Sequence, residues 1–205
     1  MTAPAGQDLH PLDRAAQDLL FRAARTADAF AADPVTDEQV HAIHDLVRHG
    51  PTAFNSQPLR IVLLRSTDAR RRLLPHLSRG NRDKTAAAPL TAILAADTSF
   101  HDHLPRVFPH RPEIREWFAG PGHAGEREAH ARFNAALQIG YLIVGIRAAG
   151  LAAGPMAGFD PAGLDTEFFP DGRLRSLVVV NIGRPAGTAR ARLPRLSTTD
   201  VIHTL

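Results

Sequence analysis

The chain has 205 residues, of which 44% are hydrophobic and 22% are charged, as is ordinary for a soluble globular protein. It contains no cysteine, which excludes a disulfide framework, thiol catalysis and cysteine-ligated metal sites. The net charge is only +3 and no basic run is interleaved with aromatic residues, so we expect no nucleic-acid partner. The N-terminus lacks a basic start followed by an apolar core, which predicts no signal peptide and hence a cytoplasmic protein.

Two helices are predicted near the start of the chain. Apolar residues at helical spacing begin at residue 12 and predict a helix that ends within residues 24–30. The second helix begins after Thr36, because Thr36 and Gln39 have the spacing of a capping box, and it ends at Gly50-Pro51. Its buried stripe is expected to comprise Val40, Ile43, Leu46 and Val47.

The middle of the chain alternates between strand-like and helix-like segments. Residues 60–64 predict a strand, and residues 67–77 predict a short basic helix. Residues 87–97 are continuously apolar, which is typical of a strand in a sheet that is covered on both faces. Residues 98–124 are rich in His, Pro and Gly and predict an irregular excursion, which at that length is more often functional than idle.

A long helix is predicted from Glu126 to about Gly150. It is apolar nearly all round over residues 135–146, so we expect it in the centre of the fold or at a subunit interface. A membrane span is not expected, because the apolar stretch is shortened by Asn134, Gln138 and Arg147. The glycines that follow are spaced for helix packing and a turn, and residues 175–183 predict the last strand. With no repeat and no linker, the chain predicts one α+β or α/β domain over residues 1–205, three-layered around a central helix.

The usual catalytic signatures are absent from the sequence. There is no G-x-G-x-x-G after a strand, no G-x-x-x-x-G-K-[ST] and no G-x-S-x-G. His41 and His44 lie three residues apart on a predicted helix, and His101 and His103 share one side of an extended segment. Neither pair has an evident third ligand, so we expect no metal site and interpret these histidines as solvated.

Two sets of polar residues could hold a phosphate and a polar ring. A phosphate dianion suits guanidinium forks and a hydroxyl, which are offered by Arg25, Thr26, Arg190, Arg192 and Arg195. The alternative is that these are solvated arginines in an Arg-rich chain. Amide and hydroxyl groups suited to a heteroaromatic edge are offered by Thr52, Asn55 and Gln57. The alternative for these three residues is a capped turn after the second helix.

Lys84 is the one lysine among 24 basic residues. In an Arg-rich chain a single lysine is either chance or a position where a compact ammonium serves better than a planar guanidinium.

Six stretches, in this order, resemble a known family. They are "ARTADAF", "GPTAFNSQP", "GNRDK", "GLAAGPMAGFD", "NIG" and "RARLPRLS". The ordered set, and P-[ST]-x-x-N-S-Q-P before a strand in particular, resembles the nitroreductase family of FMN-dependent oxidoreductases over about residues 12–205. Within that family the chain is most similar to the branch of malonic semialdehyde reductase (3-hydroxypropanoate dehydrogenase), on "FPHRPEIREWF" and "FNAALQIGYLIVGIRAAGL".

The resemblance implies a nitroreductase-like three-layer α-β-α sandwich and a homodimer with the flavin sites at the subunit interface. It implies phosphate contacts from Arg25, Thr26, Arg190 and Arg192. It implies a loop against the isoalloxazine and ribityl chain made by Pro51, Thr52, Ala53, Asn55 and Gln57. Asn81 and Lys84 match an Asn and a Lys on the pyrimidine edge of the flavin, which favours a functional role for Lys84. The segment whose backbone faces flavin N5 matches Pro155, Met156, Ala157 and Gly158.

The same resemblance implies FMN as cofactor, NADH or NADPH as reductant, and ping-pong hydride transfer through flavin N5. The expected reaction is reduction of malonic semialdehyde or a similar small 3-oxo acid to the 3-hydroxy acid. His110 and Arg111 are candidates for capping the site and holding a substrate carboxylate, with a purely structural lid as the alternative. Rival functions are an NAD(P)H-dependent nitro or quinone reductase, a non-catalytic flavin-binding member, and a scaffold without flavin.

Two positions depart from the pattern of the family. Asp28 stands where many members have a third basic residue, which puts part of the phosphate cluster in doubt. Ala157 stands where members often have a glutamate, which fits the semialdehyde-reductase branch and leaves N5 contacted by backbone alone.

Overall fold

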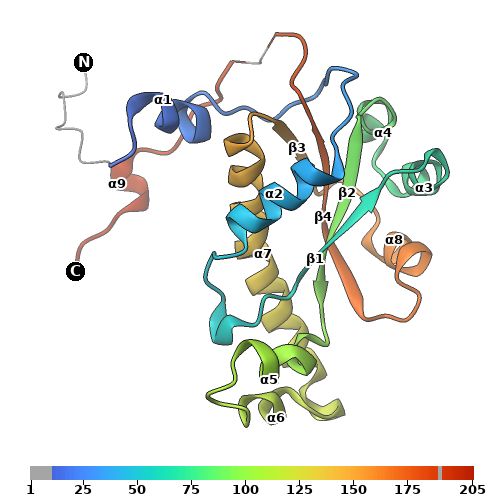
Figure 1. Cartoon of the computed structure of the whole chain (residues 1–205), viewed down its shortest axis with the longest axis vertical. Helices are drawn as coiled ribbons and strands as arrows, with labels where there is room; N and C mark the ends of the chain where they lie inside the picture. The colour runs from blue at the N-terminus through green and yellow to red at the C-terminus, as the bar shows by residue number, and fades with distance from the viewer. Residues whose placement is uncertain (1–10, 189–190) are drawn as a thin grey trace.

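An antiparallel sheet forms the centre of the fold in the computed structural model, which describes residues 11–188 and 191–205 (Figure 1). Within those residues the sheet has four strands in the order β1-β2-β4-β3, and every neighbouring pair is antiparallel. The strands are β1 (Leu59–Leu64), β2 (Leu90–Asp97), β3 (Ala152–Met156) and β4 (Leu174–Gly183). The strands predicted at 60–64, 87–97 and 175–183 are confirmed, with small shifts at their ends.

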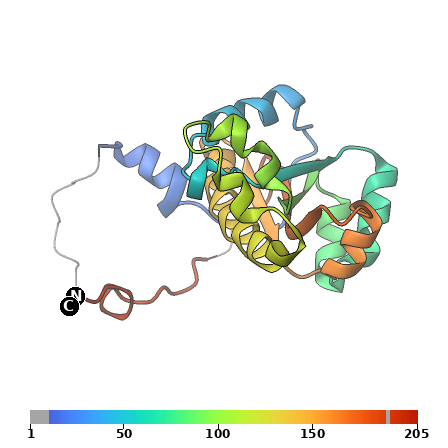
Figure 2. The same cartoon turned by 90° about the horizontal axis from the view of Figure 1, so that it is seen from below.

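Helices cover both faces of this sheet, which confirms the three-layer α+β prediction (Figures 1 and 2). One face carries α2 (Asp37–Val47) and α7 (Ala124–Ala148); the other carries α3 (Thr67–Leu73), α4 (Arg79–Ala86) and α8 (Pro161–Phe168). Side chains of the central strands face the two layers in turn: Leu94 and Val180 belong to the core with α7, whereas Ile93 and Val179 belong to the core with α3 and α8. Because both faces are covered, β2 is buried along its whole length.

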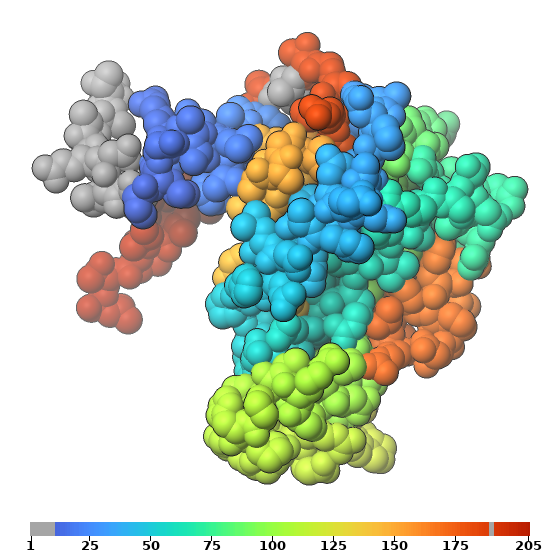
Figure 3. Space-filling view, in the orientation of Figure 1, coloured from blue at the N-terminus to red at the C-terminus, as the bar shows by residue number. Residues whose placement is uncertain are grey.

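The prediction that residues 98–124 are irregular is wrong. They form short helical segments. These are η4 (Phe100–His103), α5 (Leu104–Val107), α6 (Ile114–Phe118) and η5 (Pro121–His123). Phe100 and Phe118 form a small core with Ala131 and Ala135 of α7, and this core orders the segment. Figure 3 shows the segment as a lobe at one end of the body.

The first helix ends earlier than predicted. The α-helical turn α1 (Arg14–Gln17) continues into the π-helical turn η1 (Asp18–Arg22), and the helix stops there. Beyond it the backbone joins the edge of the sheet, since the Ala27 amide donates to the Ala153 carbonyl at 3.1 Å and the Ala31 amide to the Arg184 carbonyl at 2.9 Å. Those long-range bonds draw residues 24–30 out of the predicted helical turn.

The capping box at the start of α2 is confirmed, with Thr36 and Gln39 bonding each other's backbone amides. Ile43 is buried as predicted, but the prediction for Leu46 is wrong, because its side chain is 60% exposed. Val47 lies against Gly145 of α7, so the two helices meet there, and Leu46, one position earlier on α2, is turned away from that contact.

The long helix α7 is buried on one side only. Ile139, Leu142 and Ile146 face the core, while Phe133 and Tyr141 on the other side are 66% and 41% exposed. In a single chain the helix is therefore not buried all round. Within the described residues, none of the helices is long and apolar enough to cross a membrane.

Strand β3 is not predicted from the sequence, whose interpretation of Gly154 as a helix-packing or turn glycine is wrong. Gly154 lies at the sheet edge opposite Asn181, and a Cβ there would come within 2.5 Å of the Ala27 carbonyl oxygen. Pro155 lies in the same edge strand, where a missing amide is tolerated. The remaining short elements are η2 (Ala53–Asn55), η3 (Leu74–His76), which completes the helix predicted at 67–77, and α9 (Thr198–Val201).

Candidate functional site

The loop after α2 has an unusual backbone. Phe54, Asn55 and Gln57 have φ angles of 55°, 49° and 44°, in the left-handed region that residues other than glycine rarely adopt. Such strain persists only where the surroundings impose it, and it gathers at functional sites. The loop therefore has a structure that its neighbours hold in place.

Two long-range contacts and one local hydrogen bond fix this loop. The Ala53 amide donates to Oδ1 of Asn134 on α7 at 2.8 Å, and Nδ2 of Asn55 donates to the Val107 carbonyl at 2.8 Å. Within the loop the Gln57 amide donates to the Thr52 hydroxyl at 3.2 Å. Pro51, Ala53 and Asn55 remain exposed, so the loop presents a preformed polar surface to solvent.

Beneath the loop lies His130 of α7. Its ring stacks on Phe54 and on Phe100, and its Nε2 lies 3.2 Å from the Ser56 hydroxyl. Burial lowers the pKa of His130, against a smaller opposite effect of the Ala53 backbone, and so favours the neutral ring. This aromatic support is what the strained loop rests on.

His110 and Arg111 lie in the lobe beside the same loop. The His110 ring is 4.0 Å from the Phe108 ring, which in turn contacts Phe54 edge-on. The Arg111 guanidinium pairs with Glu113 and lies 5.6 Å from the centre of the Trp117 ring. Arg111 is thus already paired in this structure, which weakens its candidacy as a carboxylate anchor.

The second part of the candidate site is a cleft of about 630 Å³ at the other end of α7. Its walls come from the segment after η1, from β3, from α7 and from the C-terminal tail. The polar and proline residues that line it are Arg25, Thr26, Asp28, Arg147, Pro155, Arg192 and Arg195. The structure thus brings together the phosphate candidates from both ends of the sequence; Arg190, the remaining one, lies outside the described residues.

Arg25 and Arg192 converge on the same backbone carbonyls. Both donate to the carbonyl oxygens of Arg22 and Ala24, at the end of η1. Loss of water contact and the charges of Arg25 and Arg195 lower the pKa of Arg192. A group of guanidiniums that repel one another is a favourable place for an anion.

Asn81 and Lys84 lie on α4, at the side of the same region. Nδ2 of Asn81 donates to the Gly158 carbonyl at 2.9 Å, which ties α4 to the end of β3. Nζ of Lys84 lies 3.7 Å from Oδ1 of Asp28. Residues 155–158 run past this point; the Met156 side chain turns into the core, so only its backbone can face the cleft, while Ala157 is exposed.

The two parts of the site do not meet within one chain. The loop is anchored at Asn134 and the cleft reaches Arg147, positions 13 residues apart on α7 or about 20 Å along its axis. Figure 1 shows the same separation, with α5 and α6 at one end of α7 and β3 and α4 near the other.

Three residues of the site had no assigned role in the sequence. Arg147 lines the cleft and donates to the Leu19 carbonyl at 3.1 Å, whereas the sequence used it only to argue against a membrane span. Asn134 and His130 support the loop from 74 to 81 residues away. Polar residues inside an otherwise apolar helix were the available signal.

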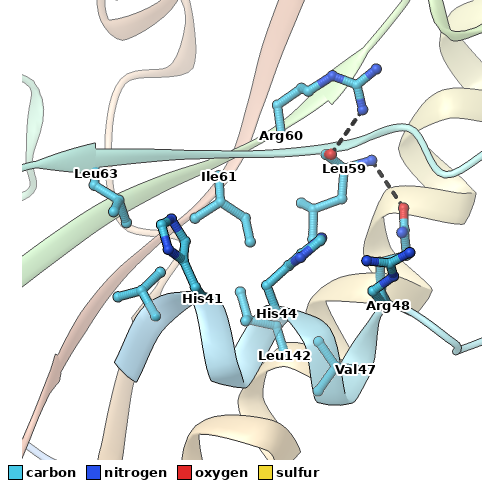
Figure 4. Close-up of a pocket in the computed structure, with 11 residues that line it drawn as sticks. His41, His44, Val47, Arg48, Leu59, Arg60, Ile61, Leu63 and Leu142 are labelled. Atoms are coloured by element: carbon cyan, nitrogen blue, oxygen red, sulfur yellow. Dashed lines mark hydrogen bonds between the residues drawn. The ribbon is translucent and has the colours of Figure 1, made fainter. Parts of the chain in front are cut away.

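The histidine pair of α2 lines a separate cavity of about 300 Å³ between α2, β1 and α7 (Figure 4). His41 and His44 point toward β1, where Ile61 and Leu63 form the opposite wall. Of the residues with a described position, none that lines this cavity carries a carboxylate. Among the residues that the structure describes, no group of three or more His, Asp or Glu is placed to hold a metal ion.

Comparison with known proteins agrees with this architecture. Residues 22–184 match the model of the nitroreductase family. A protein of Streptomyces griseus with the provisional name "NADH dehydrogenase/NAD(P)H nitroreductase" is 57% identical over 195 residues, which cover 95% of this chain and 98% of that one.

Two solved structures share the fold. A provisionally named nitroreductase of Bacillus subtilis superposes with a TM-score of 0.80 at 18% identity, covering 94% of this chain and 100% of that chain. One from Exiguobacterium sibiricum, solved in complex with FMN, has a TM-score of 0.78 at 16% identity and covers 91% and 95% of the two chains. With a family model that spans most of its length and a relative identical at more than half of its positions, the chain belongs to the nitroreductase family.

Proposed function

We propose that this protein is an FMN-dependent NAD(P)H oxidoreductase. The observation that carries the proposal is the cleft in which Arg25 and Arg192, 167 positions apart in sequence, converge on the same carbonyl oxygens. Family membership and the FMN bound to the Exiguobacterium protein support the same cofactor. The provisional name of the Streptomyces relative supports NADH or NADPH as the reductant.

The chemistry of the residues present fits FMN. The cleft has the size of a small-molecule site, about 630 Å³. At its arginine end, two guanidiniums and the Thr26 hydroxyl suit a phosphate dianion. On the α4 side, the Asn81 amide and the Lys84 ammonium suit the oxygen and nitrogen edge of a pyrimidine ring. Among the described residues that line the cleft, Asp28 is the one carboxylate and opposes this fit, and its partner Lys84 offsets its charge.

FMN, when bound, would supply the redox chemistry that links NAD(P)H to an acceptor. The chain contributes binding, orientation and electrostatics. Arg25, Thr26 and Arg192 would hold the phosphate, and Lys84 would place a positive charge at the pyrimidine edge. The Gly158 carbonyl accepts bonds from Asn81 and from the Ser78 amide, which fix the backbone of residues 155–158, the segment that would face the flavin ring.

We propose further that each complete site forms between two copies of the chain. The loop and the cleft lie too far apart in one protomer, so the loop of one copy would cover the cleft of the other. The outer side of α7 supports a twofold interface, because Phe133, Leu137 and Tyr141 are exposed apolar side chains on one helix face. The C-terminal tail, which Figure 2 shows leaving the body, adds Leu193 and Leu196 at 75% and 74% exposure.

The acceptor has two candidate classes. The resemblance to the malonic semialdehyde reductase branch favours a small 3-oxo acid, whereas the names of the relatives favour a nitroarene. Arg111 is paired with Glu113 in this structure, which counts against Arg111 as the anchor of a 3-oxo acid's carboxylate and favours the nitroarene or quinone alternative. Steady-state assays with malonic semialdehyde, a nitroarene and a quinone decide between them: a semialdehyde kcat/KM no higher than that of the nitroarene removes the 3-oxo acid.

The cofactor is tested by titration of the purified chain with FMN and with riboflavin, followed by flavin fluorescence. Arg192→Ala should weaken FMN binding by about 10- to 100-fold, the size of one or two charged hydrogen bonds, and leave riboflavin binding unchanged. Arg71→Ala, which removes an exposed arginine of α3, is the matched control. A wild-type protein that stays colourless after incubation with FMN contradicts the proposal.

The shared site is tested by mixing two defective variants. Arg25→Ala damages the cleft and Gln57→Ala the loop, so each homodimer has two damaged sites. A heterodimer of the two carries one intact site and one doubly damaged site, and it should recover about half of the wild-type activity. No recovery, or a monomer in sedimentation velocity, contradicts the shared site.

A further inference from the structure

Asp28 and Lys84 form an ion pair at the edge of the candidate flavin cleft. Nζ of Lys84 is 3.7 Å from Oδ1 of Asp28, and the two side chains are 25% and 36% exposed. Lys84 is the one lysine of the chain, and Asp28 lines the cleft beside Arg25 and Thr26. From the sequence alone, Asp28 is expected only to weaken the phosphate site.

Backbone and core contacts hold both partners in place. Asp28 lies between Ala27, whose amide donates to the Ala153 carbonyl, and Ala29, whose carbonyl accepts from the Ala186 amide, each at 3.1 Å. On α4, the neighbour of Lys84 is Thr85, which is fully buried and accepts from Nδ2 of Asn181 at 3.1 Å. The pair therefore joins two fixed elements and is not a contact between two mobile surface chains.

We propose that Asp28 sets the reduction potential of the flavin through Lys84, which makes it a positioning residue for the redox reaction. The inference rests on the proposed function. A flavin gains negative charge on its pyrimidine edge when it is reduced, and a cation there favours the reduced form. A carboxylate bound to that cation offsets part of its charge and orients the ammonium, so the potential is held lower than Lys84 alone would set it.

A second location for the effect of Asp28 is the phosphate end, because it lines the same cleft as Arg25 and Arg192. An effect through Lys84 and an effect at the phosphate end change different properties of the bound flavin. An effect through Lys84 acts on the ring and therefore on FMN and riboflavin alike, and it distinguishes oxidised from reduced cofactor. An effect at the phosphate acts on FMN only and leaves the potential unchanged.

The test is Asp28→Asn, which keeps the shape of the side chain and removes its charge. The midpoint potential of the full-length holoprotein is measured by dye equilibration, and the affinities for oxidised FMN and riboflavin by fluorescence quenching. Asp28→Asn should raise the potential by about 30 mV, which is a tenfold gain in binding of reduced over oxidised cofactor for a two-electron couple. Asp28→Ser should give a shift in the same direction.

Asp83→Asn is the matched control, because it removes an exposed carboxylate directly beside Lys84 on α4, and it should not change the potential. In a Lys84→Met background, Asp28→Asn should have no further effect on the potential. An unchanged potential in Asp28→Asn, an equal shift in the Lys84→Met background, or a gain in affinity for FMN but not for riboflavin each overturns the proposal. A wild-type chain that binds no flavin overturns the proposed function with it, whereas a flavin-binding wild type without these shifts overturns the role of Asp28 alone.

Discussion

The side-chain amide of Asn81 and the backbone of Gly158 fit each other without spare room. Nδ2 of Asn81 donates to the Gly158 carbonyl at 2.9 Å, and a Cβ added at Gly158 would lie 2.9 Å from that same nitrogen. The Ser78 amide donates to the same carbonyl at 2.9 Å. The start of α4 is thereby joined to the segment proposed to face flavin N5, and a Cβ at position 158 would require the Asn81 side chain to move.

Gly158→Ala should displace Asn81 and loosen this junction. We expect a loss of about 1–3 kcal/mol in the free energy of unfolding, as for other overpacked positions, and several-fold weaker FMN binding. The control is Gly80→Ala on the same helix, where a Cβ would meet nothing within 4 Å; that change should leave binding intact and stabilise the helix by up to about 1 kcal/mol. Equal effects of the two variants on urea unfolding and FMN titration would contradict the fit described above.

The features that the sequence predicted depend on nearby residues or on strong patterns. Thr36 and Gln39 are three residues apart, so their capping box could be recognised directly. The continuous apolar run of β2 indicates a strand that is covered on both faces, and this prediction does not depend on which elements cover it. Arg25 and Asn81 were located by resemblance to family motifs, which supplies what spacing alone does not.

What the sequence did not predict depends on distant partners. Gly154 belongs to a strand because β3 pairs with β4 there, and it is a glycine where the Ala27 carbonyl, 127 positions away, approaches it; nothing local marks either contact. In the sequence, Asn134 is only a polar residue within an apolar helix. Its role is evident only from the structure, where its side chain accepts a hydrogen bond from the Ala53 amide. The pairing of Asp28 with Lys84 likewise needs two elements to be positioned by the sheet before the charges meet.

A buried polar network should respond strongly to Asn181→Leu. Asn181 accepts from the Thr91 hydroxyl at 2.9 Å and donates to the Thr85 hydroxyl at 3.1 Å, and all three residues are buried. The change leaves the Thr91 hydroxyl without its acceptor, which costs about 1–3 kcal/mol in the free energy of unfolding. Adding Thr91→Val should recover part of that loss, and urea unfolding of the single and double variants measures it; a double variant less stable than the single one would contradict the network.

Asp97 should make the protein sensitive to acid. Its side chain is 1% exposed; burial raises its pKa, but hydrogen bonds from Arg173 and the Ser99 amide and the charge of Arg60 outweigh burial and hold the pKa below its usual value. Because the pKa is lower in the folded state, the Asp97 carboxylate contributes its full stabilisation of the fold at pH values above its unfolded-state pKa of about 3.9. This contribution is lost as the pH falls through the folded-state pKa.

Asp97→Asn should therefore cost about 2 kcal/mol or more at pH 7, because it leaves two arginines facing each other without their carboxylate. It should also flatten the fall in the free energy of unfolding below pH 4. Asp68→Asn, which removes a carboxylate 59% exposed, should do neither. Chemical denaturation at pH 7 and pH 3.5 gives both quantities, and a variant as acid-sensitive as the wild type would rule out Asp97 as the cause.

His130 should couple the strained loop to pH in the range near neutrality. Burial among Phe54, Phe100 and Phe118 lowers its pKa in the fold, so the unfolded chain binds the proton more tightly. Stability is therefore complete above the unfolded pKa of about 6.5 and decreases as the pH falls below it. His130→Gln, which cannot titrate in this range, should reduce the difference in unfolding free energy between pH 7 and pH 5, whereas His44→Gln, which removes an imidazole that is 55% exposed, should not. Hydrogen exchange of the Ala53 amide, which donates to Asn134, reports whether the loop opens with this protonation. If that amide exchanges at the same intrinsic-corrected rate at both pH values in the wild type, His130 does not control the loop.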